Sequence, residues 1–293
     1  MSTAALDLLP PAAMHDLVPD LRARLAGVGA YSTSLDKISD GEIRINEDGM
    51  DTRLPSPFKD APATAAAVRR AKERAPTYGR GNLPAVMWMA STVSFSTLFA
   101  NSSGVIQKVY DAVPASGPTP EQRTEVMRYF DALTSTLGEG KQLLVKAETG
   151  FLAVLPLLRE DQKELSAAAA GMNQSIAKLE ETVRDTALKY ALNPLTAGLA
   201  NIMIKVGSRH TDYLRRTRET VAHAADHCDR AANDLAILAG HALTLIGKYQ
   251  GVGNSLKAAQ GAAFKEFIGE LQLQVALKTW KSFGDYVMQQ MGM

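Results

Sequence analysis

The sequence contains one cysteine, few aromatic residues and almost no net charge. Cys228 is the only cysteine in 293 residues, so the chain has no internal disulfide and no all-cysteine metal site. Aromatic residues make up 6% of the chain, and abundant alanine favours helix over sheet. With 32 Lys and Arg against 31 Asp and Glu, no global field directs the protein to nucleic acid, so we expect no nucleic-acid partner.

The N-terminus, MSTAALDLLPPAAMHDLVPD, lacks the basic start and the long apolar run of a secretory signal. Asp7, Pro10 and Pro11 interrupt the segment where such a run would stand. We therefore expect a product that is cytoplasmic when made. Secretion by a signal-independent route leaves no mark of this kind in a sequence.

Residues 36–47, DKISDGEIRINE, partly match the twelve positions of a calcium loop. The matching residues are Asp36, Asp40, Gly41, Ile43 and Glu47. Ile38, however, stands where a loop of this kind needs an oxygen ligand, and the residues after Glu47 run into Gly49 and Pro55 instead of a second helix. An acidic turn is favoured over a calcium site.

Two histidines and the cysteine are the remaining candidates for chemistry. His223 and His227 are four residues apart on a predicted helix, a spacing that could hold a metal, but the glutamate of a metalloprotease motif is missing. Cys228 lies on an apolar helix seam, where a small buried residue is favoured over a nucleophile. We expect no metal, no cofactor and no enzymatic activity.

An uncharged run extends from Gly81 to Gln107 and includes NLPAVMWMASTVSFSTLFANSSGVIQ. Its length could cross a bilayer, which takes about 20 apolar residues. Its Ser and Thr content, and helical spacing that continues into charged residues as far as Val113, favour a helix of residues 84–113 buried among other helices. A later release into a membrane stays open for this second apolar segment. Its candidate residues are Met87, Trp88, Phe95, Leu98 and Phe99.

Two long heptad series determine the predicted fold. The first series is Leu165, Ala169, Met172, Ile176, Leu179, Val183, Thr186 and Tyr190. The second is His210, Leu214, Thr217, Val221, Ala224, Cys228, Ala231, Leu235, Leu238, Ala242, Leu245 and Tyr249. Such spacing is typical of packed helix seams, and the break at Asn193-Pro194 predicts an antiparallel hairpin over residues 158–249 with an apolar turn at 191–207.

The sequence therefore predicts an all-α protein, a single elongated helical domain over residues 1–293. Residues 32–62 read as an irregular connection, in which the alternation of polar and apolar residues at 42–46 allows a short strand or β-hairpin. Thr119, Pro120 and Gln122 predict a helix start with a capping box. Bends are expected at 138–140 and at Pro156, and GVGNS at 251–255 is expected to separate the hairpin from a final helix over 255–290.

The hairpin turn combines apolar and basic side chains. The apolar candidates for membrane contact are Leu192, Leu195, Leu199, Ile202, Met203 and Ile204. The basic candidates for headgroup contact are Lys189, Lys205, Arg209, Arg215 and Arg216. Either another segment covers the apolar residues and the basic ones form a solvated face, or the turn is a contact surface for anionic lipid.

This layout resembles the α-helical pore-forming toxins, the cytolysin A-like group with haemolysin BL and xenorhabdolysin-type components. The segments that carry the resemblance are NLPAVMWMASTVSFSTLFANSSGVIQ and ALNPLTAGLANIMI. The resemblance implies a soluble bundle that exposes apolar segments on a membrane and oligomerises, with or without a partner component. The apolar turn is shorter than the usual tongue. The alternative is a structural or adaptor protein that docks a partner through its long helices.

Overall fold

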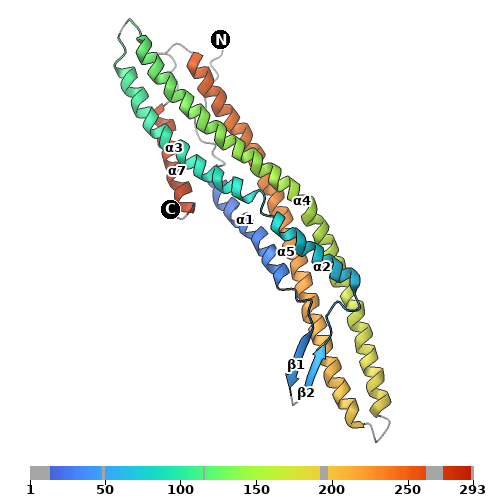
Figure 1. Cartoon of the computed structure of the whole chain (residues 1–293). Coiled ribbons are helices and arrows are strands. Elements are labelled where there is room, and N and C mark those ends of the chain that lie inside the picture. The colour runs from blue at the N-terminus through green and yellow to red at the C-terminus, as the bar shows by residue number, and fades with distance from the viewer. Residues whose placement is uncertain (1–13, 48–49, 115, 192–196, 262–272, 292–293) are drawn as a thin grey trace. The chain divides into compact units, whose positions relative to one another are not determined.

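The chain is almost entirely helical in the computed structural model, which describes residues 14–47, 50–114, 116–191, 197–261 and 273–291 (Figure 1). The helices are α1 (Met14–Asp36), α2 (Pro62–Arg74), α3 (Asn82–Asp111), α4 (Pro120–Ala191), α5 (Ala197–Gly261) and α7 (Leu273–Met291), with a 3₁₀ turn, η1 (Ala75–Thr77). Within the described residues, the strands are β1 (Ile43–Glu47) and β2 (Met50–Leu54), which pair antiparallel with Ile43 opposite Leu54. The predicted all-α class is confirmed.

The chain divides into two compact units. Unit 1 comprises Met1–Leu25, Gly79–Ala153 and Leu235–Met293, and unit 2 comprises Ala26–Tyr78 and Val154–Asp234. The long helices α4 and α5 each contribute one part to unit 1 and another to unit 2. Each unit is described separately below.

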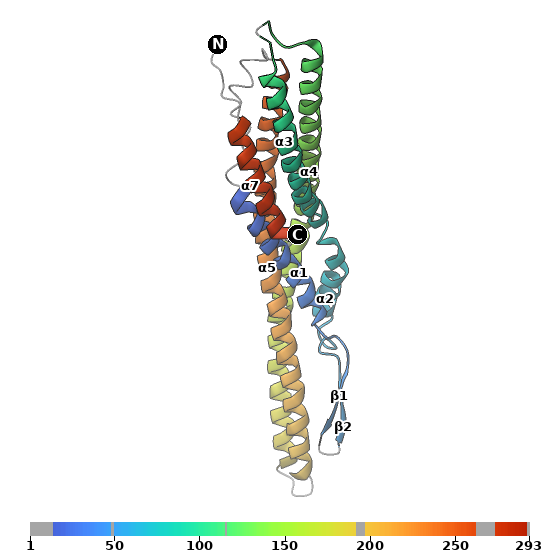
Figure 2. The same cartoon turned by 90° about the vertical axis from the view of Figure 1, so that its left-hand side faces the viewer.

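In unit 1, the uncharged run forms α3, and α7 packs along it in both views (Figures 1 and 2). Phe95 meets the Trp280 ring edge-on at a centroid distance of 4.6 Å, and the Ser96 hydroxyl donates to the Trp280 carbonyl over 2.6 Å. Gly284 permits this approach, because a Cβ there would lie 2.4 Å from the Ser96 hydroxyl oxygen. The inner face of α3 is therefore a packed core surface.

The outer face of α3 begins with exposed apolar residues. Leu83 is 67% exposed and Met87 is 49% exposed. The stretch Pro62–Asp111 contains an 18-residue window of mean hydropathy 1.4, of which 39% is buried, so by length and composition this segment could cross a membrane. A core helix of a soluble protein passes the same test, and the packing on α7 favours that interpretation.

In unit 2, α4 and α5 run side by side as the predicted hairpin (Figure 2). The heptad series lie on the inner faces: in unit 2 every member of the second series from Leu214 to Ala231 is buried, and the members from Leu235 to Tyr249, which belong to unit 1, are buried as well. The first series is buried from Leu165 to Ile176 and then becomes progressively exposed, reaching 37% at Tyr190. The seam is therefore tight in the middle of the hairpin and looser toward its turn.

Helix ends confirm one local prediction and contradict another. The capping box is present: the Thr119 amide donates to the Gln122 side-chain oxygen (2.9 Å), and the Gln122 amide donates to the Thr119 hydroxyl (3.2 Å). The predicted break at 251–255 is wrong, since α5 continues to Gly261. Helical glycines cost about 1 kcal/mol each, and burial of Tyr249 and Val252 on the inner face of α5 offsets that cost. α4 also continues unbroken through 138–140 and Pro156.

Candidate functional site

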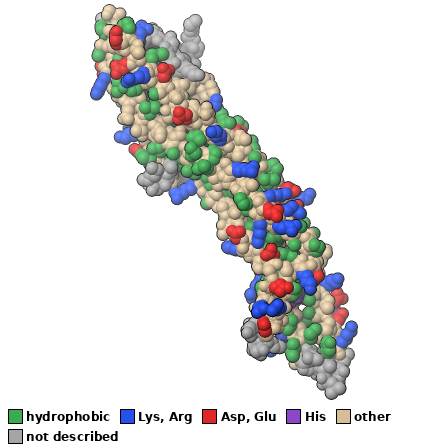
Figure 3. Space-filling model, viewed as in Figure 1, with side chains coloured by type: hydrophobic (Ala, Val, Ile, Leu, Met, Phe, Trp, Pro, Cys, Tyr) green, Lys and Arg blue, Asp and Glu red, His purple; other side chains and the backbone are tan. Residues whose placement is uncertain are grey.

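The end of the α4–α5 hairpin in unit 2 presents large apolar side chains to solvent. Ile202, Met203 and Ile204 on α5 are 40%, 44% and 43% exposed, and Leu188 on α4 is 56% exposed. Figure 3 shows apolar side chains beside the grey atoms at this end of the molecule. Three of the six residues predicted for membrane contact are thus exposed. The placement of Leu192 and Leu195, and the side chain of Leu199, lie outside the described residues.

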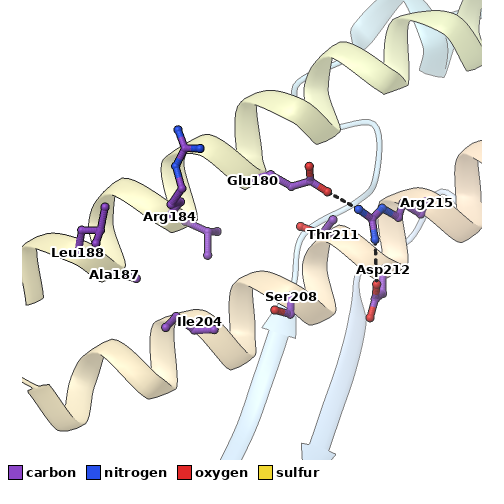
Figure 4. Close-up of a pocket in the computed structure, with 10 residues that line it drawn as sticks. Glu180, Arg184, Ala187, Leu188, Ile204, Ser208, Thr211, Asp212 and Arg215 are labelled. Carbon is purple, nitrogen blue, oxygen red and sulfur yellow. Dashed lines mark hydrogen bonds and ion pairs between the residues drawn. The ribbon is translucent and has the colours of Figure 1, made fainter. Parts of the chain in front are cut away.

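A groove of about 550 Å³ opens between α4 and α5 next to these residues. Figure 4 shows Ala187, Leu188 and Ile204 at the end nearer the turn, while Glu180, Asp212 and Arg215 lie at the other end. The helices approach closely at Gly207, where a Cβ would lie 2.5 Å from Val183. The groove therefore changes from apolar to charged along its length.

The predicted headgroup residues differ in how they are engaged. Arg215 spans the groove to Glu180 (2.5 Å) and also lies 3.8 Å from Asp212 on its own helix. Arg216, one position on, is exposed and has no ion-pair partner among the residues described. Lys189 and Lys205 are exposed and border the uncharged residues 190–204. Arg209 is half-buried. Arg215 therefore pairs across the groove, whereas the exposed Lys189 and Arg216 extend to solvent.

The second apolar segment, in unit 1, faces mainly inward. Trp88, Phe95 and Phe99 are buried, Leu98 is partly buried and Met87 is exposed. The Trp88 indole donates to the Tyr249 hydroxyl over 3.1 Å, and burial raises the pKa of Tyr249 to about 12. In this conformation, four of the five residues are engaged in the core of unit 1.

Unit 2 contains a buried polar cluster that was not predicted from the sequence. Asp161 on α4 is fully buried, and its carboxylate accepts hydrogen bonds from the hydroxyls of Tyr31 (3.0 Å) and Tyr78 and from Arg74 (2.8 Å). Burial is the largest cause that raises the pKa of both tyrosines, and the nearby carboxylate adds to it. One signal was available: Asp161 stands between Leu158 and Leu165, three and four residues away, on the seam itself.

The candidate calcium loop, the candidate metal-binding histidines and Cys228 do not form a reactive site in the described residues. Asp36 ends α1 while residues 43–47 form β1, and His223 is exposed. Among the residues that the structure describes, no three His, Cys, Asp or Glu side chains gather as a metal site would require. Cys228 is fully buried, its thiol donates to the Leu158 carbonyl (2.9 Å), and burial raises its pKa to about 12. A thiol protonated to that extent is a poor nucleophile.

Comparison with known proteins places this fold among the soluble components of α-pore-forming toxins. Soluble SmhA of the tripartite toxin Smh from Serratia marcescens aligns over 98% of this chain and 95% of its own, with 13% identity and a TM-score of 0.55. The HblL1 toxin component of Bacillus cereus covers 95% and 97%, with 11% identity and a TM-score of 0.53. Soluble AhlB of the tripartite toxin AHL from Aeromonas hydrophila covers 95% and 93%, with 9% identity and a TM-score of 0.54. At these identities the likeness is one of fold.

Comparison by sequence gives no match. No family model matches the chain, and no curated protein matches it. The resemblance drawn from the layout of the sequence is confirmed by the fold.

Proposed function

We propose that the protein is a pore-forming or membrane-perturbing toxin component whose hairpin end makes the first contact with a lipid bilayer. The observation that carries this proposal is the exposed apolar surface formed by Leu188, Ile202, Met203 and Ile204, with Lys189 and Lys205 at its border. Isolated exposed apolar residues are ordinary on a protein surface, but a group at the end of a hairpin is a contact surface.

The uncharged length limits how deeply this end can enter. The part of α5 from Ala197 to Ile204 is about 12 Å long, whereas a bilayer core is about 30 Å thick. The hairpin end therefore reaches into one leaflet and does not span both. Lysine side chains at the border can extend to the phosphate layer while their methylene groups stay among the acyl chains.

The charged residues of the groove support the same shallow depth of entry into the bilayer. Glu180, Asp212 and Arg215 lie at the end of the groove farther from the turn, and burying such charges in hydrocarbon costs several kcal/mol each. They would therefore stay at or above the headgroups. A shallow contact of this kind leaves room for further steps, in which other copies or a partner component complete the assembly, as expected of a multi-component toxin.

The fold comparison supports the toxin class, because SmhA and AhlB are named as components of tripartite toxins. In this proposal the protein leaves the producing cell and acts on a target membrane. Oligomerisation and the need for a partner component are parts of the proposal that follow from the toxin class.

The test is binding to liposomes and release of an entrapped dye. Ile202→Asp places a charge in the exposed apolar surface, and Ile237→Asp is a matched control because both isoleucines are 40% exposed on α5. We expect Ile202→Asp to weaken vesicle binding about tenfold or more, and Ile237→Asp to leave it unchanged. Vesicles containing phosphatidylserine should bind more tightly than neutral ones, because lysines near an anionic surface each add about 1 kcal/mol.

The opposite result would favour the adaptor reading. If the wild-type protein binds no lipid mixture, or if both variants bind as well as the wild type, the hairpin end is not a membrane surface. Circular dichroism of both variants verifies that the helices remain formed.

A further inference from the structure

A second cavity in unit 2 lies between α4, α5 and the segment that follows β2. Its volume is about 470 Å³, within the range of about 300–1,000 Å³ typical of small-ligand sites. One wall is the turn of residues 55–61, which Pro57 and Phe58 anchor by burial. The Phe58 amide donates to the Ser56 hydroxyl (3.3 Å), and the Ala61 amide donates to the Phe58 carbonyl (3.0 Å). This wall is thus a turn held in place by buried side chains and hydrogen bonds.

Polar residues from all three elements line this cavity. The polar groups that line it are Ser56, Lys59, Asp60, Gln174, Ser175, Lys178, Thr182 and His210. Lys59 and Lys178 have no ion-pair partner within the described parts of the chain. In the neighbouring groove, by contrast, Arg215 is paired with Glu180. The cavity is therefore lined by two exposed lysines that no carboxylate of the described residues pairs with.

His210 is partly enclosed at this cavity. Burial lowers the pKa of His210, while the carboxylate of Asp60 raises it in part. Asp60 is the one carboxylate among the lining residues, so two ammonium groups outnumber it. An anion is consequently the ligand that the charge balance favours.

We infer that this cavity binds a phosphate monoester. Such a group carries about −1.5 to −2 charges near pH 7 and three strong acceptor oxygens, which match the ammonium groups of Lys59 and Lys178. The hydroxyl of Ser175 and the amide of Gln174 supply neutral donors for the organic part of the ligand. Charge-assisted hydrogen bonds of this type are about twice as strong as neutral ones.

The ester could be a free metabolite or the headgroup of a lipid. Lys178 precedes the end of α4 at Ala191 by 13 residues, or about 20 Å along the helix. With the hairpin end in one leaflet, the cavity would lie close to protruding headgroups. The lipid source rests on the proposed function, whereas phosphate binding by the cavity does not.

The first experiment measures soluble ligands by calorimetry, with inorganic phosphate and glycerol 3-phosphate as probes and glycerol as the uncharged control. The variant Lys59→Ala/Lys178→Ala removes both ammonium groups from the cavity. Lys37→Ala/Lys163→Ala removes the same charge from exposed positions of unit 2 that do not line the cavity. We expect the cavity variant to bind glycerol 3-phosphate about tenfold more weakly than the wild type, and the control to match the wild type.

The second experiment uses vesicles of phosphatidylcholine with either phosphatidic acid, a phosphate monoester, or phosphatidylserine, a phosphate diester. Preference for phosphatidic acid that is lost in the cavity variant identifies a lipid as the source. Soluble binding that survives in Ile202→Asp, while vesicle binding is lost, separates this cavity from the hairpin end. If the wild type binds soluble ester but no vesicle, the proposed function fails and this inference stands.

Two outcomes would overturn the inference. One is a wild-type protein that binds neither soluble ester nor phosphatidic acid in preference to phosphatidylserine. The other is a cavity variant that binds as the wild type does in both experiments.

Discussion

The two units hold their outer helices by different chemistry. In unit 1, α7 is held on α3 by aromatic packing of Trp280 against Phe95 and Phe99, with Gly284 allowing close approach. In unit 2, the Tyr31 and Arg74 side chains attach α1 and α2 to α4 through the single carboxylate of Asp161. Apolar contact depends on shape and is indifferent to protonation, whereas a buried polar network requires every partner to be present and correctly charged.

The largest expected effect is in unit 1. Trp280→Ala removes a fully packed ring and should lower the free energy of unfolding by about 3–5 kcal/mol. Hydrogen exchange measured by mass spectrometry should show loss of protection in peptides of α3 and α7, with α2 unaffected. Unchanged protection in α7 would show that other contacts hold this helix and would remove the contrast between the units.

In unit 2, Asp161→Asn keeps the shape of the side chain and removes its charge. We expect a loss of about 1.5–3 kcal/mol, because hydrogen bonds to charged groups are worth about that much. Protection should be lost in α1 and α2 instead of α7. Glu160→Gln is the matched control: Glu160 also pairs with Arg74 (3.0 Å) but is 51% exposed, so its loss should cost less than about 1 kcal/mol.

A triple substitution would separate the contribution of this cluster to stability from its contribution to the specificity of helix packing. Replacing a buried ionic group by apolar residues of similar volume is often neutral or stabilising. Asp161→Leu combined with Tyr31→Phe and Tyr78→Phe removes the carboxylate with both hydroxyls that donate to it, and leaves Arg74 paired with the exposed Glu160. This variant should therefore unfold with a free energy close to that of the wild type. If Asp161→Asn costs nothing, hydrogen bonding to the carboxylate is not what holds α2.

The helical class could be predicted because heptad spacing is read from residues that are close together in the sequence. The buried positions of the structure follow the same spacing. The members of the second series from Leu214 to Tyr249 are all buried, as a packed seam requires. The break predicted at 251–255 failed because glycine propensity is a weak preference that tertiary packing overrides. Buried Val252 lies within that segment, and α5 continues through it.

The sites were predictable to different degrees. An exposed hairpin end follows from the apolar composition of residues 191–204, and Ile202, Met203 and Ile204 are exposed. The Asp161 cluster joins residues separated by 83 and 130 positions, so no local pattern reveals its partners. The cavity beside His210 depends in the same way on where the turn of residues 55–61 lies relative to α4 and α5.

The last expected effect grows with pH and concerns alkaline solution. Burial, followed by interactions with the nearby Cys228 and Asp161, raises the pKa of Tyr31 and Tyr78 above their ordinary value near 10. A group whose pKa is raised by folding stabilises the folded state fully below its unfolded pKa, and that contribution is lost as the pH rises through the folded pKa. Unit 2 should therefore lose stability progressively above about pH 10. Tyr249 in unit 1, with a pKa raised to about 12, gives unit 1 a smaller dependence of the same sign.

Fluorescence and circular dichroism can separate the two units in this measurement. Both tryptophans, Trp88 and Trp280, belong to unit 1, so their fluorescence reports that unit while circular dichroism reports all helices. Between pH 9 and 11.5, urea should reduce the helical signal at lower concentrations than it alters the fluorescence. Tyr31→Phe/Tyr78→Phe should reduce this dependence on pH, because it removes two buried ionising groups from unit 2, while the buried thiol of Cys228 remains. Equal alkaline loss by both probes in the wild type and the double variant would show that the buried tyrosines do not distinguish the units.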